Sequence, residues 1–320
     1  MEEKKKLVVI ALGGNAIKQA GEEGTAQDQF RNVARTCEHL VTMNKLGYKL
    51  ILTHGNGPQA GNLLIQQEEG QGLVPGQPLD VLDAMTQGQI GYMFQNQLQN
   101  AFHRVGKDIP IATLITQVLV DKDDPDFKNP SKPVGPFYSK EEAVELQEKK
   151  GYLVKEAKPN AQKGWRRIVP SPEPIGLVEA DTIKILLDNH VIIITSGGGG
   201  IPVVKTKNDD IRGIEAVVDK DRAGQKLAEI VGGDIFLVLT DVDNAFINFG
   251  KPDQQALGEI NISQTEEYIK KGHFGAGSMG PKIEACIRFV KAGGERAIIT
   301  SLDKAVEALN GDTGTHIIAD

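Results

Sequence analysis

The chain of 320 residues has only two cysteines, Cys37 and Cys286, and they show no CxxC or other metal-ligand spacing. This scarcity excludes a disulfide-rich secreted scaffold and a cysteine-based zinc site. No apolar run reaches about 18 residues, the length that a membrane-spanning helix needs. Residues 1–6, five of which are charged, lead straight into an apolar run that glycine ends too early for a signal peptide. We therefore expect a cytoplasmic protein without a membrane segment.

Basic residues are also too few for a nucleic-acid-binding protein. Lysine and arginine number 36 against 43 acidic residues, which gives a formal net charge of −7. Nucleic-acid-binding domains usually carry a basic surplus, so we expect no nucleic-acid partner. The apolar share of 40% and charged share of 25% are those of an ordinary globular protein. The length admits one large α/β domain or two smaller lobes.

The common phosphate-binding and hydrolytic motifs are missing too. There is no GxxxxGK[ST] loop, and the glycine loop of protein kinases is absent together with its HRD and DFG partners. The run of four glycines at 197–200 leads into Ile201-Pro202, so it is not a dinucleotide fingerprint. No Ser-His-Asp arrangement and no metal-ligand spacing is visible. His54 is the only histidine in a glycine-rich turn, where a ligand role is one alternative.

What the sequence does have is three apolar runs that each end in glycines. Residues 8–12 lead into Gly13-Gly14-Asn15, residues 50–54 into Gly55-Asn56-Gly57, and residues 191–196 into Gly197-Gly198-Gly199-Gly200. Continuous β-branched runs are typical of strands buried on both faces. Glycine lets backbone N–H groups approach an anion closely, and a following helix N-terminus favours one. A single such turn can be purely structural, but three predict a phosphate-handling enzyme.

Strand and helix patterns alternate along the chain, which favours a mostly parallel sheet covered by helices. The expected helices are residues 27–46, 61–70, 78–105 (with glycine interruptions), 140–150, 222–231, 281–292 and 303–310, and further expected strands are 109–120, 235–240 and 296–300. Prolines and charges accumulate at 121–170. We interpret this segment as an excursion from the main sheet, with a long surface loop as the alternative.

Three lysines are candidate phosphate ligands. Lys220 lies between two aspartates just before an expected helix, where the alternative is a surface ion pair. Lys282 follows Pro281 in a first helical turn, an unfavourable place for a cation unless an anion binds there. Lys132 is flanked by prolines in the excursion, where most lysines are merely solvated. Thr240 and Asp241 end another buried strand, which is where open α/β sheets bind ligands.

Together these motifs resemble the amino acid kinase superfamily and, within it, the carbamate kinases. The matching stretches run in family order over nearly the whole chain: 11–16, 54–59, 164–167, 197–202, 218–221, 272–282 and 313–316. Each stretch is weak alone, whereas the set is highly specific.

The resemblance implies a single domain over residues 1–320, a three-layer αβα sandwich with a mostly parallel central sheet. Its N-terminal half, about 1–175, would bind carbamoyl phosphate and carry a protruding subdomain at about 121–170. Its C-terminal half, about 176–320, would bind the nucleotide. The resemblance also implies a homodimer and reversible phosphoryl transfer from carbamoyl phosphate to ADP. The usual setting is the ATP-yielding last step of the arginine deiminase pathway.

The site residues follow from the same resemblance, read together with the chemistry of phosphoryl transfer. The substrate-binding set is Gly13, Gly14, Asn15, Gly55, Asn56 and Gly57; the nucleotide-binding set is Gly197, Gly198, Gly199, Gly200, Thr240, Asp241 and Met279. The catalytic set is Lys132, Lys220 and Lys282, with Asp221 holding the last two. Mg²⁺ would arrive on the nucleotide phosphates, with no metal site built by the protein.

Ala11 separates this chain from part of the superfamily. Relatives such as acetylglutamate kinase carry a lysine two residues before the first Gly-Gly pair, where this chain has Ala11. A kinase of a small carboxylate is therefore the weaker alternative. A non-catalytic nucleotide sensor on the same fold is a further one, although it predicts lost lysines and all three are present.

Overall fold

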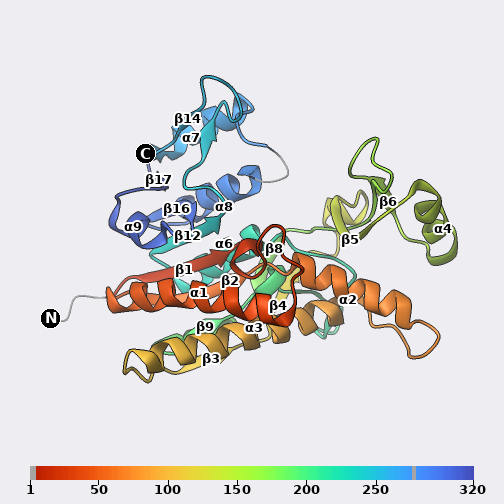
Figure 1. Cartoon of the computed structure of the whole chain (residues 1–320), viewed down its shortest axis with the longest axis horizontal. Helices are drawn as coiled ribbons and strands as arrows, with labels where there is room; N and C mark the ends of the chain where they lie inside the picture. The colour runs from red at the N-terminus through yellow and green to blue at the C-terminus, as the bar shows by residue number, and fades with distance from the viewer. Residues whose placement is uncertain (1–4, 276–278) are drawn as a thin grey trace.

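The computed structural model describes residues 5–275 and 279–320 as three layers, with a central sheet between two layers of helices (Figure 1). Residues 1–4, and the 276–278 part of the 272–282 motif, lie outside the described residues. The architecture confirms the expected αβα sandwich. Among the described residues, no helix is both long and apolar enough to cross a membrane.

The central sheet has eight strands in the order β15-β17-β16-β12-β1-β2-β9-β3. Their bounds are β15 (Glu259–Asn261), β17 (Thr315–Ile318), β16 (Arg296–Ser301), β12 (Ile235–Thr240), β1 (Leu7–Leu12), β2 (Lys49–His54), β9 (Ile192–Ile194) and β3 (Ile111–Thr113). The six strands from β16 to β3 run parallel, and β17 pairs antiparallel with β16. The sheet is thus mostly parallel, as predicted. The final strand β17 was not expected, because the sequence analysis ended the regular structure at the last helix.

Alternate residues of β1 face the two helical layers. Val8, Ile10 and Leu12 pack with α1 (Ala26–Lys45), α3 (Leu79–Arg104) and α9 (Ala305–Asn310). Val9 and Ala11 pack with α5 (Ala180–Asp188), α6 (Lys220–Val231) and α8 (Met279–Lys291), and α7 (Ile262–Lys270) lies beside α8. Burial on both faces explains why β1 reads as a continuous apolar run rather than an alternating one.

The prediction of one strand over residues 109–120 is wrong. The chain forms two strands there, and they belong to different sheets. β3 ends at Thr113 in the central sheet, and β4 (Gln117–Val120) joins a second sheet of order β11-β10-β4-β8. Its other strands are β11 (Ile211–Gly213), β10 (Ile201–Lys205) and β8 (Pro174–Leu177), and a separate pair joins β13 (Phe246–Ile247) to β14 (Gln255–Ala256). The Thr116 hydroxyl lies 2.5 Å from that of Thr195. This polar contact marks the point where the chain leaves the central sheet.

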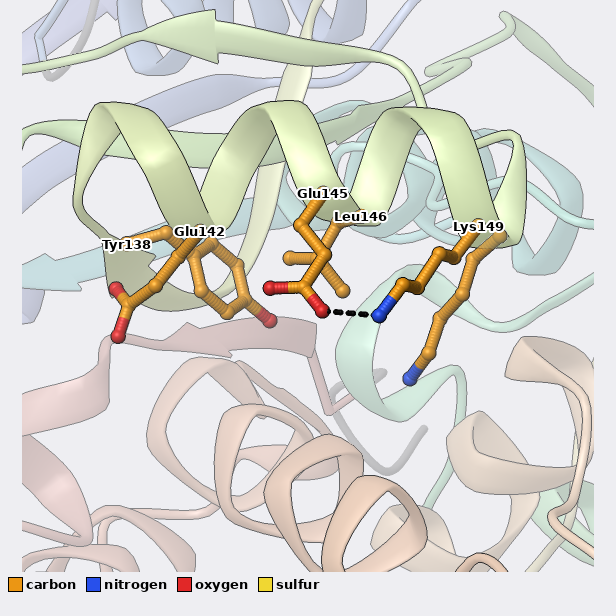
Figure 2. Close-up of a pocket in the computed structure, with 6 residues that line it drawn as sticks. Tyr138, Glu142, Glu145, Leu146 and Lys149 are labelled. Atoms are coloured by element: carbon orange, nitrogen blue, oxygen red, sulfur yellow. Dashed lines mark hydrogen bonds and ion pairs between the residues drawn. The ribbon is translucent and has the colours of Figure 1, made fainter.

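Within residues 121–170, a three-stranded sheet of order β5-β7-β6 and one helix project from the sandwich (Figure 1). The elements are β5 (Lys132–Tyr138), α4 (Lys140–Lys150), β6 (Val154–Glu156) and β7 (Trp165–Val169). α4 has the expected bounds because Ser139 and Glu142 form a capping box and Gly151 ends the helix at φ 66°. A cavity of about 280 Å³ lies beneath α4 and is lined by Tyr138 and five residues of the helix. Figure 2 shows these side chains. None of the three candidate lysines lines this cavity.

The other expected helices differ from the observed ones mainly at their first residues, whereas α5 and α7 were not expected. α2 (Gly57–Gly70) begins four residues early, at the second glycine turn itself, and α6 begins at Lys220 rather than at Arg222. α3 runs without a break through its glycines. One of them, Gly91, lies so close to Thr113 that an added Cβ would be 2.2 Å from Cγ2. Gly91 therefore permits close packing of α3 on β3 rather than interrupting the helix.

Cys37 and Cys286 are both free and fully buried, in the cores on opposite faces of the sheet. Burial raises the pKa of each thiol, which keeps it protonated and unreactive.

Candidate active site

The three glycine-rich turns follow strands that are immediate neighbours. β1 pairs in parallel with β2, and β2 pairs in parallel with β9. Carboxyl ends of adjacent parallel strands lie at one edge of the sheet, so the turns that leave them lie side by side. The backbone N–H of Gly55 donates to the carbonyl of Leu12 at 3.1 Å, which ties the second turn to the end of β1.

The third turn packs directly on the second. A Cβ added to Gly197 would lie 2.4 Å from the His54 ring, and one added to Gly198 would lie 2.3 Å from the Asn56 amide nitrogen. Only glycine fits such contacts, and Gly198, Gly199 and Gly200 all have positive φ. The third turn therefore supports the second. Its contact with a nucleotide stays a prediction.

Lys220 and Lys282 meet at one buried carboxylate, Asp221. Lys220 Nζ lies 2.6 Å from Asp221 Oδ1, and Lys282 Nζ lies 3.1 Å from Oδ2. Asp221 is only 3% exposed. The Lys220 side chain also crosses the second turn, because a Cβ on Gly55 would meet its Cδ at 3.3 Å. Residues far apart in the sequence thus place two ammonium groups at the glycine turns.

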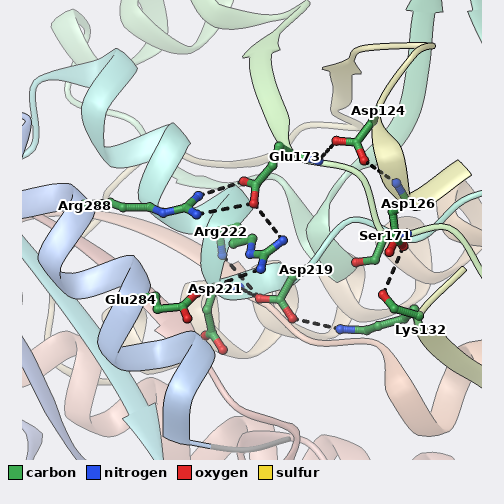
Figure 3. Close-up of polar contacts among 11 residues, drawn as sticks. Asp124, Asp126, Lys132, Ser171, Glu173, Asp219, Asp221, Arg222, Glu284 and Arg288 are labelled. Atoms are coloured by element: carbon green, nitrogen blue, oxygen red, sulfur yellow. Dashed lines mark hydrogen bonds and ion pairs between the residues drawn. The ribbon is translucent and has the colours of Figure 1, made fainter. Parts of the chain in front are cut away.

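Lys132 reaches the same region from the projecting subdomain. Its Nζ lies 2.8 Å from Asp219 Oδ2 (Figure 3), while Asp219 Oδ1 caps α6 by accepting from the N–H groups of Asp221 and Arg222. Burial alone would raise the pKa of Asp219, but the Lys132 ammonium and these hydrogen bonds lower it to about 2. Sequence analysis missed Asp219 as the partner of Lys132. Its only signal was an N-cap residue type directly before α6.

Glu173 fastens the base of the subdomain to the C-terminal helices (Figure 3). Its carboxylate lies 2.8 Å from Arg222 on α6 and 2.7 Å from Arg288 on α8, and its N–H donates to Asp124. These contacts hold the two ends of the subdomain against α6. Because Asp219 and Asp221 lie at the N-terminal end of α6, these contacts also fix the position of Lys132 relative to the other two lysines.

Lys132, Lys220, Lys282, Asp219 and Asp221 form a lysine cluster whose net charge favours an anion. Three lysine ammonium groups face two aspartate carboxylates, which leaves a formal charge of +1. Three helices begin at this edge: α2 at Gly57, α6 at Lys220 and α8 at Met279. A helix N-terminus carries a partial positive charge and free N–H groups, so each adds to the attraction for phosphate.

His54 is buried in the protein interior. It is 2% exposed, its ring stacks on Phe94 with centroids 6.1 Å apart, and Nδ1 lies 3.0 Å from the Gly55 carbonyl oxygen. Burial lowers the pKa of His54 to about 4, so the imidazole is neutral at pH 7. The structure gives this histidine a packing role.

We expect His54 to make the fold sensitive to mild acid. The unfolded chain takes up a proton near pH 6.5, whereas the folded chain takes it up only near pH 4. The free energy of unfolding is unaffected by this histidine above pH 6.5 and falls as the pH drops toward 4, by roughly 2.5 kcal/mol at pH 4.5. Denaturant unfolding at pH 7 and pH 4.5 measures this loss. It should shrink in His54→Gln but not in His103→Gln, an exposed histidine, and equal losses in both variants would contradict the assignment.

The remaining candidates lie beside the first turn and at the start of α8. Thr240 ends β12, next to β1, and a Cβ on Gly13 would lie 3.8 Å from its Cα. Thr240 Oγ1 lies 3.0 Å from Asp241 Oδ1, and Asp241 is exposed. Met279 is the first described residue of α8 and packs against the core. Within residues 5–275 and 279–320, no group of three or more His, Cys, Asp or Glu side chains could hold a metal ion.

Comparison with known proteins shows which family the chain resembles. The model of the amino acid kinase family matches residues 6–301. A carbamate kinase of Thermococcus kodakarensis is 54% identical over 98% of this chain and 99% of its own length, and one of Pyrococcus furiosus is 51% identical over 98% and 99%. The structure of carbamate kinase from Giardia lamblia bound to AMP-PNP superposes with a TM-score of 0.93, at 46% identity and 99% coverage of both chains.

Proposed function

Because the chain belongs to the amino acid kinase family and, within it, to the carbamate kinases, we propose that its lysine cluster transfers a phosphoryl group between carbamoyl phosphate and ADP. The products are ATP and carbamate, which breaks down to ammonia and carbon dioxide. The observation that carries the proposal is the meeting of Lys220 and Lys282 at Asp221, beside the glycine turns. The AMP-PNP bound to the Giardia enzyme supports a nucleotide partner.

The proposed reaction needs charge and positioning rather than acid–base chemistry. The attacking ADP β-phosphate is already ionised, and carbamate leaves as an anion, so no general base is required. Lys132, Lys220 and Lys282 surround the phosphoryl group in the transition state and offset the negative charge on its oxygens. The backbone N–H groups of the first two turns hold carbamoyl phosphate in line with the nucleotide.

The nucleotide enters as its magnesium complex in this proposal. Mg²⁺ would enter bound to the nucleotide and would offset the negative charge of its phosphates, with few ligands from the protein. Gly197–Gly200, Thr240, Asp241 and Met279 form the nucleotide side. The proposed setting is the ATP-yielding end of arginine fermentation by the arginine deiminase pathway, in the cytoplasm, with the protein acting as a homodimer.

A coupled assay for ATP tests the reaction. We expect ATP from carbamoyl phosphate and MgADP, and no ADP from acetylglutamate and MgATP. A lysine two residues before the first Gly-Gly pair would favour the second reaction, but this position is Ala11, buried inside β1 at 1% exposure. Turnover of acetylglutamate without turnover of carbamoyl phosphate would overturn the proposal.

Lys132→Ala tests whether the subdomain takes part in the chemistry. The substitution removes one of three cations, and we expect kcat to fall about tenfold or more. The effect should be smaller than at the other two lysines, because the Lys132 side chain is 34% exposed and solvent screens its charge. Lys128→Ala, in the same segment and exposed, is the matched control and should retain kcat. A normal kcat in both variants would reduce the subdomain to a passive cover.

A further inference from the structure

The second glycine turn contains an N-cap asparagine that does not cap its helix. Asn56 precedes α2 in the N-cap position, where an asparagine side chain usually accepts from an N–H group of the first turn. Here the side chain makes no such bond. Its Nδ2 donates instead to Thr86 Oγ1 at 3.1 Å and to Asp83 Oδ1 at 3.3 Å, both on α3. The Asn56 side chain therefore belongs to a buried polar network with α3 and does not cap α2.

Hydrogen-bond accounting fixes which way the amide faces. Thr86 has one hydroxyl proton, and it donates this proton to the backbone carbonyl of Asp83 at 2.8 Å. Thr86 Oγ1 can then only accept from Asn56, so the NH₂ group and not the carbonyl must face α3. Thr86 is 0% exposed and Asp83 is 2% exposed, so water does not compete for these bonds. The orientation follows from chemistry and not from a choice between two similar atoms.

Asp83 accepts a hydrogen bond from the Asn56 amide through its Oδ1. It has no cationic partner among the described residues, and its Oδ2 is buried without a hydrogen bond there. Burial raises the pKa of Asp83 well above its usual value. Gly198 packs against the Asn56 amide group, because a Cβ added to Gly198 would lie 2.6 Å from Asn56 Cγ.

With both amide protons used, Oδ1 is the one polar atom of the Asn56 side chain that has no hydrogen-bond partner within residues 5–275 and 279–320. An acceptor in this turn cannot serve a phosphate, which has only acceptor oxygens of its own. It suits the amino group of a carbamoyl moiety, which donates two N–H bonds. The acetyl group of acetyl phosphate has the same shape but presents a methyl group there.

Resting on the proposed function, we propose that Asn56 Oδ1 accepts a hydrogen bond from the carbamoyl NH₂ group, and that Thr86 and Asp83 are positioning residues that fix this acceptor. The network thereby makes the site select carbamoyl phosphate over acetyl phosphate. A site that offers an acceptor to a substrate N–H group disfavours the analogue that lacks it, because the acceptor is left unpaired.

The test is the ratio of kcat/KM for carbamoyl phosphate to kcat/KM for acetyl phosphate, with MgADP. In Thr86→Val, which keeps the shape but removes the hydroxyl, we expect this ratio to fall about tenfold. Thr86→Ser, the matched control, keeps the hydroxyl and should keep the ratio. The concentration of active enzyme cancels in this ratio, so a variant that is partly unfolded still gives the correct value.

Asn56→Ala provides a second variant that leaves the α3 residues in place. It should lower kcat/KM for carbamoyl phosphate more than for acetyl phosphate, also by about tenfold. Equal losses for the two substrates in Thr86→Val and in Asn56→Ala would overturn the inference while leaving the proposed function intact. A wild-type protein that forms no ATP from carbamoyl phosphate would overturn the proposed function instead.

Discussion

Replacing Lys282 with alanine lowers kcat for ATP formation by roughly 10²-fold or more, as we expect from the loss of about 3 kcal/mol of transition-state stabilisation. The Lys282 side chain is only 13% exposed, so solvent screens its charge weakly. Lys220→Ala should have an effect of the same size, because its side chain is 22% exposed and meets the same carboxylate. Steady-state kinetics at saturating MgADP and carbamoyl phosphate measure both.

Each lysine has a control on its own helix. Lys291 on α8 pairs with Glu266 on the surface, and Lys226 on α6 pairs with Glu229. Surface ion pairs contribute about 1 kcal/mol or less, so alanine at either position should leave kcat near normal. A near-normal kcat in purified Lys282→Ala or Lys220→Ala would remove that lysine from the mechanism.

Asp221→Asn carries the second large expected effect. The substitution keeps the shape of the side chain but removes the charge that holds two ammonium groups about 3 Å from one carboxylate. We expect the lysines to move apart and kcat to fall by roughly 10²-fold, since misplacement of charged groups costs about as much as their removal. Because Asp221 acts through both lysines, the double variant with Lys282→Ala should lose much less than the product of the single losses.

Asp181→Asn is the matched control for Asp221. Asp181 is also the second residue of a helix, α5, but it is exposed. Both substitutions remove a favourable charge from a helix N-terminus, which is worth about 0.3–1 kcal/mol at an exposed position. A similar, small loss of activity in the two variants would show that Asp221 serves only its own helix.

The sequence predicts the sheet and the position of the site because both depend on local patterns. The runs at 8–12, 50–54 and 191–196 contain strands buried on both faces, the last of them only over Ile192–Ile194, and parallel strands bring their following turns to one edge. The contact of Asp221 with both lysines was expected from the family resemblance, and the structure places these groups together.

What the sequence could not predict are contacts between segments with no pattern of their own. Lys132 and Asp219 are separated by 87 residues, and Asn56 and Thr86 by 30. No periodicity connects such pairs, since tertiary packing alone decides which polar groups share a buried space. The sequence likewise gives no signal that the chain passes from one sheet to another between Thr113 and Gln117, where Thr116 contacts Thr195.

Carbamoyl phosphate labelled with ³²P on its phosphorus tests the central claim most directly. Incubated with the wild-type protein and MgADP, the label should appear in the γ-phosphate of ATP, and this transfer should be nearly absent with Lys282→Ala. Release of the label only as inorganic phosphate, or equal labelling of ATP by the two proteins, would contradict phosphoryl transfer by the lysine cluster.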